Sequence, residues 1–204
     1  TPVIKGYGTD MGYRIVTASQ QVYGGHGYIR EWGMEQYVPD ARIAQIYEGT
    51  NGVQAMDLVG RKLGKDGGRA IQAFFKLVGE AVAEGKANPK LADIAARLEK
   101  ANGELQAATM WLMQNGLTNP NNAGAAAVPY LHIMGIVAVG LMWLKLATAA
   151  QALVDAGQGD AAFNEAKLIT ARFFAERIMP DAGSLRRKLE GGAEALMALP
   201  VEAF

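Results

Sequence analysis

Apolar residues recur at helical spacing along most of the chain. Between residues 69 and 85 they fall every three or four positions, at Ile71, Phe74, Phe75, Val78 and Val82, which is typical of an amphipathic helix. A second stripe continues from about residue 91 to 114, after Pro89 at the expected helix start. No segment of useful length alternates with the period of a β-strand. The pattern predicts an all-α protein.

Two further helices are expected in the second half of the chain. A turn-rich stretch over residues 115–122 precedes a very apolar helix over about residues 123–156. A last helix runs from about residue 160 to 179 and ends at Pro180–Gly183. Long helices with short connections indicate an up-and-down helical bundle.

The apolar helix allows a second interpretation. Residues 123–144 carry no formal charge over roughly the length that spans a bilayer. However, Pro129, His132, Gly135 and Gly140 interrupt the stretch, and no Lys or Arg cluster flanks it. A central bundle helix contacted on all sides gives the same pattern. We favour a buried helix and expect no membrane span.

The first 63 residues differ in local composition, with aromatic, glycine and charged residues close together. They predict a helix over about residues 10–22, a glycine-rich break, a helix over 33–45 limited or bent by Pro39, and a helix over 51–63 with Thr50 as its N-cap. Turn-forming residues occupy positions 64–68. We therefore divide the chain into domains 1–63 and 64–204.

Composition excludes several classes of function. The 204 residues contain no cysteine, so disulfide frameworks and thiolate metal sites are absent. Twenty Lys and Arg balance twenty Asp and Glu, so no global positive field favours nucleic acid. His26 and His132 are far apart without a carboxylate pattern, and we predict a turn histidine and a core histidine and no metal site. The chain starts at Thr1 without a leader; we expect a cytoplasmic protein and a piece of a longer one.

The stretch from Gln21 to Gln54 holds the candidate chemistry. The glycine-rich turn Tyr23–Tyr28 is neither a dinucleotide fingerprint nor a P-loop, and by itself it is better explained as an ordinary loop. Glu48 lies between Tyr47 and Gly49, just before an expected helix start, where free N–H groups could meet a polar ligand. By itself it could also be a solvated or capping carboxylate.

Taken together, these motifs resemble the C-terminal segment of the acyl-CoA dehydrogenases. The matching segments are Gln21 to Tyr28 (QVYGGHGY), Asp40 to Ile43 (DARI) and Ile46 to Gln54 (IYEGTNGVQ). The helical remainder resembles the extra C-terminal domain of a larger subgroup, the 3-methylmercaptopropionyl-CoA dehydrogenase-like enzymes. The resemblance implies that the first domain is part of the C-terminal helical domain of the acyl-CoA dehydrogenase fold, and that the second domain is the extra helical bundle.

The resemblance also implies a role for each site residue. Glu48 corresponds to the catalytic base, which removes the α-proton of an acyl-CoA thioester while the β-hydrogen passes as hydride to N5 of FAD. A base for this weakly acidic C–H needs desolvation, and the enolate oxygen needs a donor, for which the Glu48 N–H is the candidate. Gly49 and Tyr47 correspond to substrate-contacting positions.

Two segments correspond to FAD contacts. Gln21, Val22, Tyr23, Gly24 and Gly25 match a segment that usually contacts the FAD of a neighbouring subunit, and glycine N–H groups suit a pyrophosphate. A second segment, at the start of the next helix, consists of Thr50, Asn51 and Gly52. Pro39 stands where the family usually has Arg, a departure expected to affect local geometry or FAD affinity.

The resemblance implies an acyl-CoA substrate, electron-transfer flavoprotein as acceptor, and a homo-oligomer. The family's N-terminal helical domain and middle β-domain have no counterpart in this sequence, so we expect the chain to be inactive alone. The alternative from another class is a non-catalytic helical oligomerisation module, with Trp111 and Trp143 as large core anchors.

Overall fold

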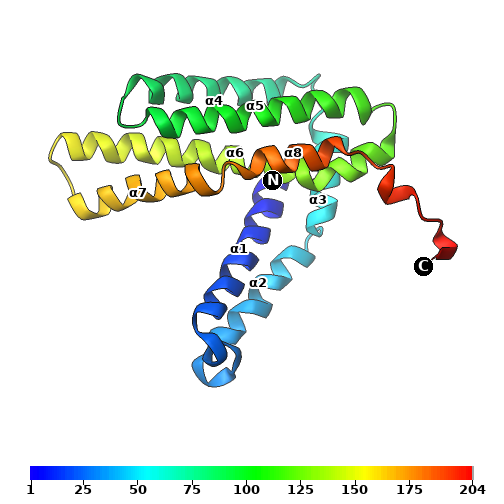
Figure 1. Cartoon of the computed structure of the whole chain (residues 1–204), viewed down its shortest axis with the longest axis horizontal. Helices are drawn as coiled ribbons and strands as arrows, with labels where there is room; N and C mark the ends of the chain where they lie inside the picture. The colour runs from blue at the N-terminus through cyan, green and yellow to red at the C-terminus, as the bar shows by residue number, and fades with distance from the viewer. Residues whose placement is uncertain (204) are drawn as a thin grey trace.

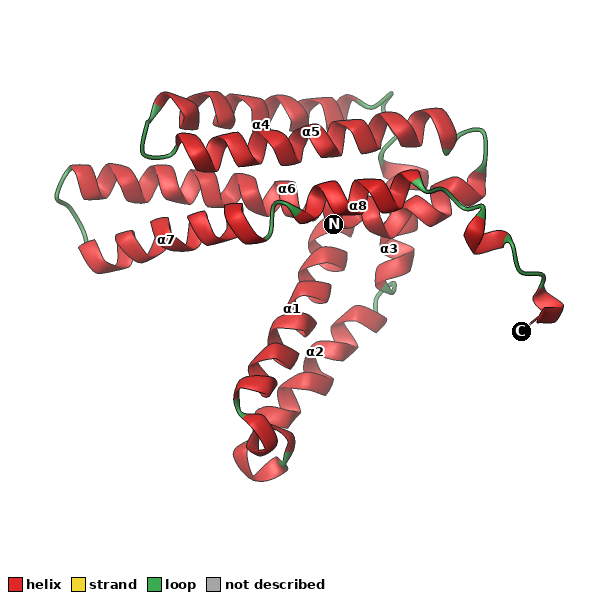
Figure 2. Cartoon of the chain, viewed as in Figure 1, coloured by secondary structure: helices red, strands yellow, loops and turns green. Residues whose placement is uncertain are grey.

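The computed structural model describes residues 1–203 and contains helices and turns, without a strand in that range (Figure 2). This confirms the all-α prediction. The α-helices are α1 (Pro2–Val22), α2 (Tyr37–Ile46), α3 (Asn51–Asp57), α4 (Arg69–Ala87), α5 (Ala92–Asn115), α6 (Pro120–Asp155), α7 (Ala161–Arg177) and α8 (Asp181–Glu190).

The helices form a bundle and a projecting arm (Figure 1). Helices α4 to α8 form the bundle, in which α4 and α5 are antiparallel and α7 and α8 follow one another along α6. The arm consists of α1, which runs outward from the bundle, short 3-10 turns at the tip, and α2, which returns. Helix α3 then leads back to the bundle. The expected up-and-down bundle is confirmed.

Helix α6 is the centre of the bundle. It contacts α1, α3, α4, α5, α7 and α8, and its sequence is long and apolar enough to meet the criteria for a membrane span. Half of its most apolar window is nevertheless buried inside the protein. Fully buried Tyr130 shares a 2.9 Å hydrogen bond with Thr109 of α5, and burial raises the pKa of Tyr130 to about 12. These contacts are those of a core helix.

Two expected helix boundaries in the arm were wrong. Helix α1 begins at Pro2 rather than near residue 10. Its glycines weaken the local helix propensity, but one of them, Gly6, lets α1 pack closely on α6. The helix expected over 33–45 divides into a 3-10 turn at Met34–Gln36 and α2 from Tyr37. Pro39 lies in the first turn of α2, where a missing N–H costs no hydrogen bond.

Two boundaries near the domain ends were also different. The helix expected over 51–63 is α-helical only to Asp57 and continues as a π-helical turn over Leu58–Lys62. Pro180–Gly183 does not end the helical structure, since α8 starts at Asp181 directly after Pro180. Proline near a first helical position is a start signal as well as a stop signal.

The arm joins the bundle where α1 crosses α6 at very short range. A Cβ built on Gly6 of α1 would come within 2.8 Å of Leu131 Cδ1. A Cβ built on Gly135 of α6 would overlap the Tyr7 ring, with Tyr7 Cδ2 at 2.6 Å. Each glycine therefore accommodates a large side chain of the opposite helix. Tyr7 and Leu131 are both buried at this crossing.

A polar cluster lies beside this crossing; we call it the junction cluster and define it as Lys5, Thr9, Asp10, Gln45, Asn51 and His132. Asp10 Oδ1 accepts hydrogen bonds from Gln45 Nε2 at 2.7 Å and from Asn51 Nδ2 at 2.6 Å. Asp10 Oδ2 lies 2.8 Å from His132 Nε2. Asp10 thus links α1 to α2, α3 and α6 through one carboxylate.

Asn51 has a second set of partners in α1. Its Nδ2 also donates to Gly6 O at 3.1 Å and Thr9 Oγ1 at 2.9 Å, and its Oδ1 accepts from Lys5 Nζ at 2.7 Å. The start of α3 is therefore fixed against the bundle end of α1.

We predict that Gly135→Ala destabilises the protein by about 1–3 kcal/mol, because the new Cβ cannot fit beside Tyr7 without moving α1. Gly8→Ala on α1, the other helix of the crossing, is the control: a Cβ there meets nothing within 4 Å, and alanine should stabilise α1 by up to about 1 kcal/mol. Denaturant unfolding of the two variants checks this. Equal stability of Gly135→Ala and wild type would contradict the close crossing.

The junction cluster predicts a specific loss of stability in acid. Burial alone would raise the pKa of Asp10, but hydrogen bonds from Gln45, His132 and Asn51 outweigh it and hold that pKa below its ordinary 3.8. A depressed folded-state pKa means that ionised Asp10 stabilises the fold above about pH 4, and that this contribution disappears as the pH falls through the folded-state pKa.

The comparison of wild type with Asp10→Asn measures this contribution. The difference in unfolding free energy between the two proteins should be largest near neutral pH and should shrink below pH 4. A difference that is constant down to pH 2 would show that the Asp10 charge contributes nothing.

Candidate functional site

The candidate base lies in a short loop between α2 and α3, here called the Glu48 loop (Tyr47–Thr50). Tyr47 is extended, with φ −83° and ψ 169°. Glu48 and Gly49 both have positive φ, at 55° and 82°. A left-handed conformation costs a residue other than glycine about 1–2 kcal/mol, so the surrounding structure must hold Glu48 in this conformation.

Hydrogen bonds at both ends of the loop supply that constraint. Gln54 Nε2 donates to Glu48 O and to Gly49 O, each at 3.3 Å. Thr50 Oγ1 donates to Gln45 O at 3.2 Å. Thr50 thus takes the predicted N-cap position, but its side chain bridges the loop instead of capping α3.

The Glu48 side chain is exposed in this chain. The desolvation that a thioester α-proton requires of its base is therefore not provided by residues 1–203. The Glu48 N–H makes no hydrogen bond within that range, so it is free to donate to a ligand oxygen. Tyr47 and Gly49, the predicted substrate contacts, flank Glu48 and are also exposed.

The first predicted FAD segment lies at the tip of the arm. Gln21 and Val22 end α1, Tyr23 follows, and Gly24 and Gly25 begin a 3-10 turn. All five are exposed, and a Cβ on either glycine would meet nothing within 4 Å. The backbone of this segment is therefore open to a ligand.

The second predicted FAD segment lies at the other end of the arm. Thr50 and Gly52 are exposed, whereas the Asn51 side chain is engaged with α1 in the junction cluster. Asp10, which Asn51 contacts, and Gln21 are separated by about 16 Å along α1, at about 1.5 Å per residue. The two predicted FAD segments therefore lie at opposite ends of the arm.

The supporting residues were missed by sequence reasoning. His132 was expected to be a core residue without a carboxylate partner, but its side chain is 19% exposed and pairs with Asp10. The two residues are 122 positions apart, and no local pattern in the sequence connects them. His26, predicted in a turn, lies in one and packs edge-on against Trp32.

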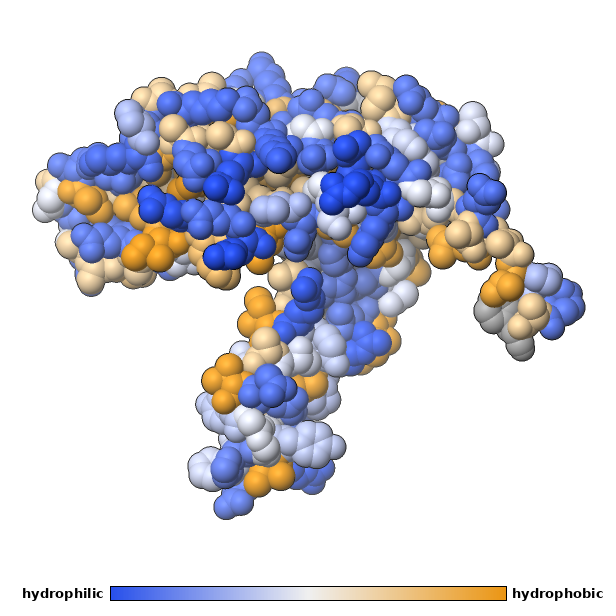
Figure 3. All heavy atoms as spheres, viewed as in Figure 1, coloured by the Kyte–Doolittle hydropathy of each residue, from blue (hydrophilic) through white to orange (hydrophobic). Residues whose placement is uncertain are grey.

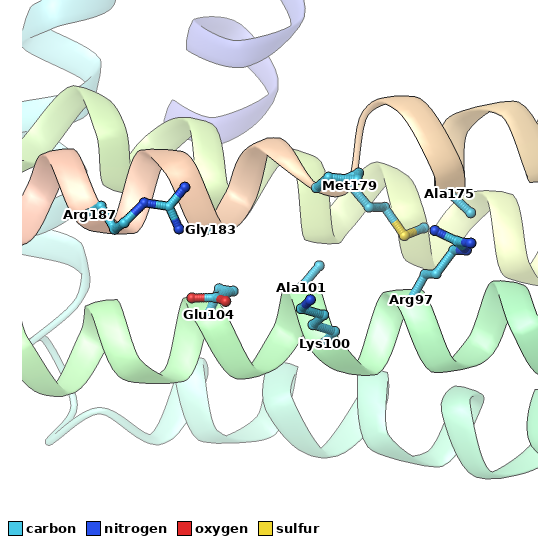
Figure 4. A pocket seen from close by; sticks show the side chains of 9 residues that line it. Arg97, Lys100, Ala101, Glu104, Ala175, Met179, Gly183 and Arg187 are labelled. Carbon is cyan, nitrogen blue, oxygen red and sulfur yellow. The ribbon is translucent and has the colours of Figure 1, made fainter.

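Two cavities lie away from the Glu48 loop, with no residue of the loop in their walls. One of about 180 Å³ separates α5 from α8 and is lined by Arg97, Lys100, Glu104 and Arg187, as Figure 4 shows. Next to this cavity, Arg186 of α8 pairs with Glu104 of α5 and with Glu190. No cluster of metal-ligating side chains occurs in the described part of the chain.

Comparison with known proteins covers both parts of the structure. Residues 1–63 match the family model described as acyl-CoA dehydrogenase, C-terminal domain. Residues 70–200 match the model described as acetyl-CoA dehydrogenase C-terminal like.

Several relatives match almost the whole chain. 3-Methylmercaptopropionyl-CoA dehydrogenase of Ruegeria pomeroyi is 34% identical over 197 residues, which is 96% of this chain and 33% of the relative. Broad-specificity linear acyl-CoA dehydrogenase FadE5 of Mycobacterium tuberculosis is 35% identical over 211 residues, which is 100% of this chain and 34% of the relative.

A further relative matches about a quarter of the chain. The short-chain specific acyl-CoA dehydrogenase of Megasphaera elsdenii is 43% identical over 54 residues, 26% of this chain. The chain spans about a third of the length of the relatives that match it throughout. It belongs to the acyl-CoA dehydrogenase family and corresponds to the C-terminal helical part of such a protein.

Proposed function

We propose that this chain carries the catalytic base and part of the FAD-binding surface of an FAD-dependent dehydrogenase that introduces a double bond between the α- and β-carbons of an acyl-CoA thioester. The observation that carries the proposal is the Glu48 loop, in which a carboxylate is held at φ 55° between two helices tied to α1. The motifs around this loop supply the family resemblance.

Glu48 would accept the α-proton of the thioester. Its carboxylate is exposed on this chain, so a bound acyl-CoA and the remainder of the protein would supply the desolvation that strengthens it as a base. As charge develops on the thioester oxygen, the unpaired Glu48 N–H is a suitable donor. Gly49, exposed beside the base, would contact the acyl group; its φ of 82° and the Gln54 amide, 2.7 Å from where a Cβ would stand, require glycine at this position.

The FAD-contacting residues would act through their backbone. Gly24 and Gly25 leave open space where side chains would stand, and Gly52 does the same at the start of α3. Such bare backbone suits the diphosphate of FAD, through N–H groups that donate to its oxygens. When bound, FAD supplies the acceptor for the hydride that leaves the β-carbon.

The surface of the arm supports association with further protein. Large apolar and aromatic side chains are exposed along the arm; they include Ile15, Val22, Tyr28, Trp32, Tyr37, Ile43 and Tyr47. Orange spheres on the arm in Figure 3 mark its exposed aliphatic residues. An exposed apolar surface of this extent marks an interaction site. We propose that the remainder of the protein and a second subunit cover it, and that electron-transfer flavoprotein takes the electrons.

Replacement of the base tests the proposal in the full-length protein. Glu48→Gln keeps the shape of the side chain but cannot accept a proton, so acyl-CoA-dependent bleaching of the flavin should slow by about 10²–10⁴-fold. Glu31→Gln, an exposed carboxylate on the same arm, should leave the rate unchanged. A Glu48→Gln protein that bleaches at nearly the wild-type rate would exclude Glu48 as the base.

A second prediction concerns the 204-residue chain alone. Its FAD segments are exposed and lie at opposite ends of the arm, so the isolated chain should release FAD on gel filtration and show no dehydrogenase activity. Absorbance near the flavin band of the protein peak measures this. Stoichiometric flavin in that peak would show that the chain holds FAD without further domains.

A further inference from the structure

The junction cluster connects the bundle to the Glu48 loop. We propose that His132 of α6 is a positioning residue for the proposed base, which it holds in place through Asp10. This inference rests on the role proposed for Glu48 and assigns the helical bundle a part in the reaction beyond packing.

The first link joins the bundle to the arm. His132 Nε2 and Asp10 Oδ2 are 2.8 Å apart, and both side chains are largely buried, with 19% and 22% exposed. The His132 ring also packs edge-on against Tyr7, with ring centroids 5.6 Å apart. Tyr7 is the residue that fits against Gly135, so the ring cannot turn freely away from Asp10.

The second link joins Asp10 to both ends of the loop. Gln45 precedes the loop and Asn51 follows it, and each donates its side-chain amide to Asp10 Oδ1. Arg42 Nη1 donates to Gln45 Oε1 at 2.8 Å. This bond fixes the orientation of the Gln45 amide, so that its Nε2 is directed at Asp10.

Apolar packing and hydrogen bonds have different effects at the junction. The glycine crossing of α1 and α6 supplies close apolar packing, which holds the arm on the bundle but is non-directional. Hydrogen bonds to a carboxylate are short and directional. The path from His132 through Asp10 to Gln45 and Asn51 therefore sets the position of the loop, which hydrophobic packing alone does not.

A cavity beside His132 makes the position of Asp10 sensitive to this histidine. It has a volume of about 280 Å³ and is lined by residues of α1, α6 and α8, among them Tyr7, Arg14, His132 and Lys188. A shortened or apolar side chain at position 132 would leave the Asp10 carboxylate facing this open space. Its other oxygen would then hold the loop ends less rigidly.

Two substitutions of His132 in the full-length enzyme test the inference. His132→Leu removes the hydrogen bond, and kcat should fall about ten- to hundredfold with KM within about threefold, since displacement of a catalytic group by about 1 Å has an effect of this size. His132→Gln can place an amide N–H near the position of Nε2. It should restore kcat to within about threefold of wild type.

A variant at the loop end keeps the test valid if His132→Leu folds poorly. Gln45→Leu breaks the same path without touching the bundle and should lower kcat similarly. The double variant should lose no more than either single one, because substitutions within one network are not additive. Lys90→Met is the control. It removes an exposed ion pair between Lys90, just before α5, and Asp155 at the end of α6, and it should leave kcat unchanged.

The outcomes separate this inference from the proposed function. Wild-type kcat in His132→Leu or Gln45→Leu, or equal losses in His132→Leu and His132→Gln, would overturn the positioning role while Glu48→Gln remained inactive. Substantial activity in Glu48→Gln would instead overturn the proposed base, and with it this inference.

Discussion

The rest of the structure depends on the close crossing of α1 and α6. Gly135 and Gly6 let the two helices approach until Tyr7 and Leu131 fill the space that side chains at these positions would occupy. Protein interiors are packed as densely as organic crystals, so a contact of this kind fixes the angle and register of the arm. The end of α2 and the start of α3, both bound to α1 near the crossing, are then located relative to α6. The Glu48 loop lies between them, and its place is set by a contact many residues away in sequence.

Hydrogen bonds to Asp10 hold α2 and α3 in place beside this crossing. Asp10 lies one turn beyond Tyr7 on α1, close to the start of α3, and its carboxylate binds partners from α2, α3 and α6. A partly buried carboxylate is costly unless its oxygens are paired, and here both are. The same hydrogen bonds that lower the pKa of Asp10 also hold the two ends of the loop. Stability of the junction and placement of the proposed base therefore have a common origin.

The sequence predicted the elements that have their own local signal. The apolar stripes of α4 and α5 and the long apolar α6 were recognised because helical spacing alone defines them. The early start of α1 was not, because Gly6, Gly8 and Gly12 argue against a helix until α6 is present to pack on it. For the candidate site, the motif located Glu48 but gave no indication of its φ of 55° or its exposure. The pairing of Asp10 with His132 spans 122 positions, and only the tertiary structure could show it. The division at residues 63 and 64 and the FAD contacts stay predictions.

The central claim is that the junction between arm and bundle holds Glu48 where it can act as a base. A crystal structure of the full-length protein with FAD and a non-reactive acyl-CoA analogue tests this most directly. The account predicts a Glu48 carboxylate oxygen about 3 Å from the α-carbon of the acyl group, with Asp10 still bound to Gln45, Asn51 and His132. Another carboxylate at that α-carbon, or a Glu48 loop that has left the Asp10 contacts, would contradict it.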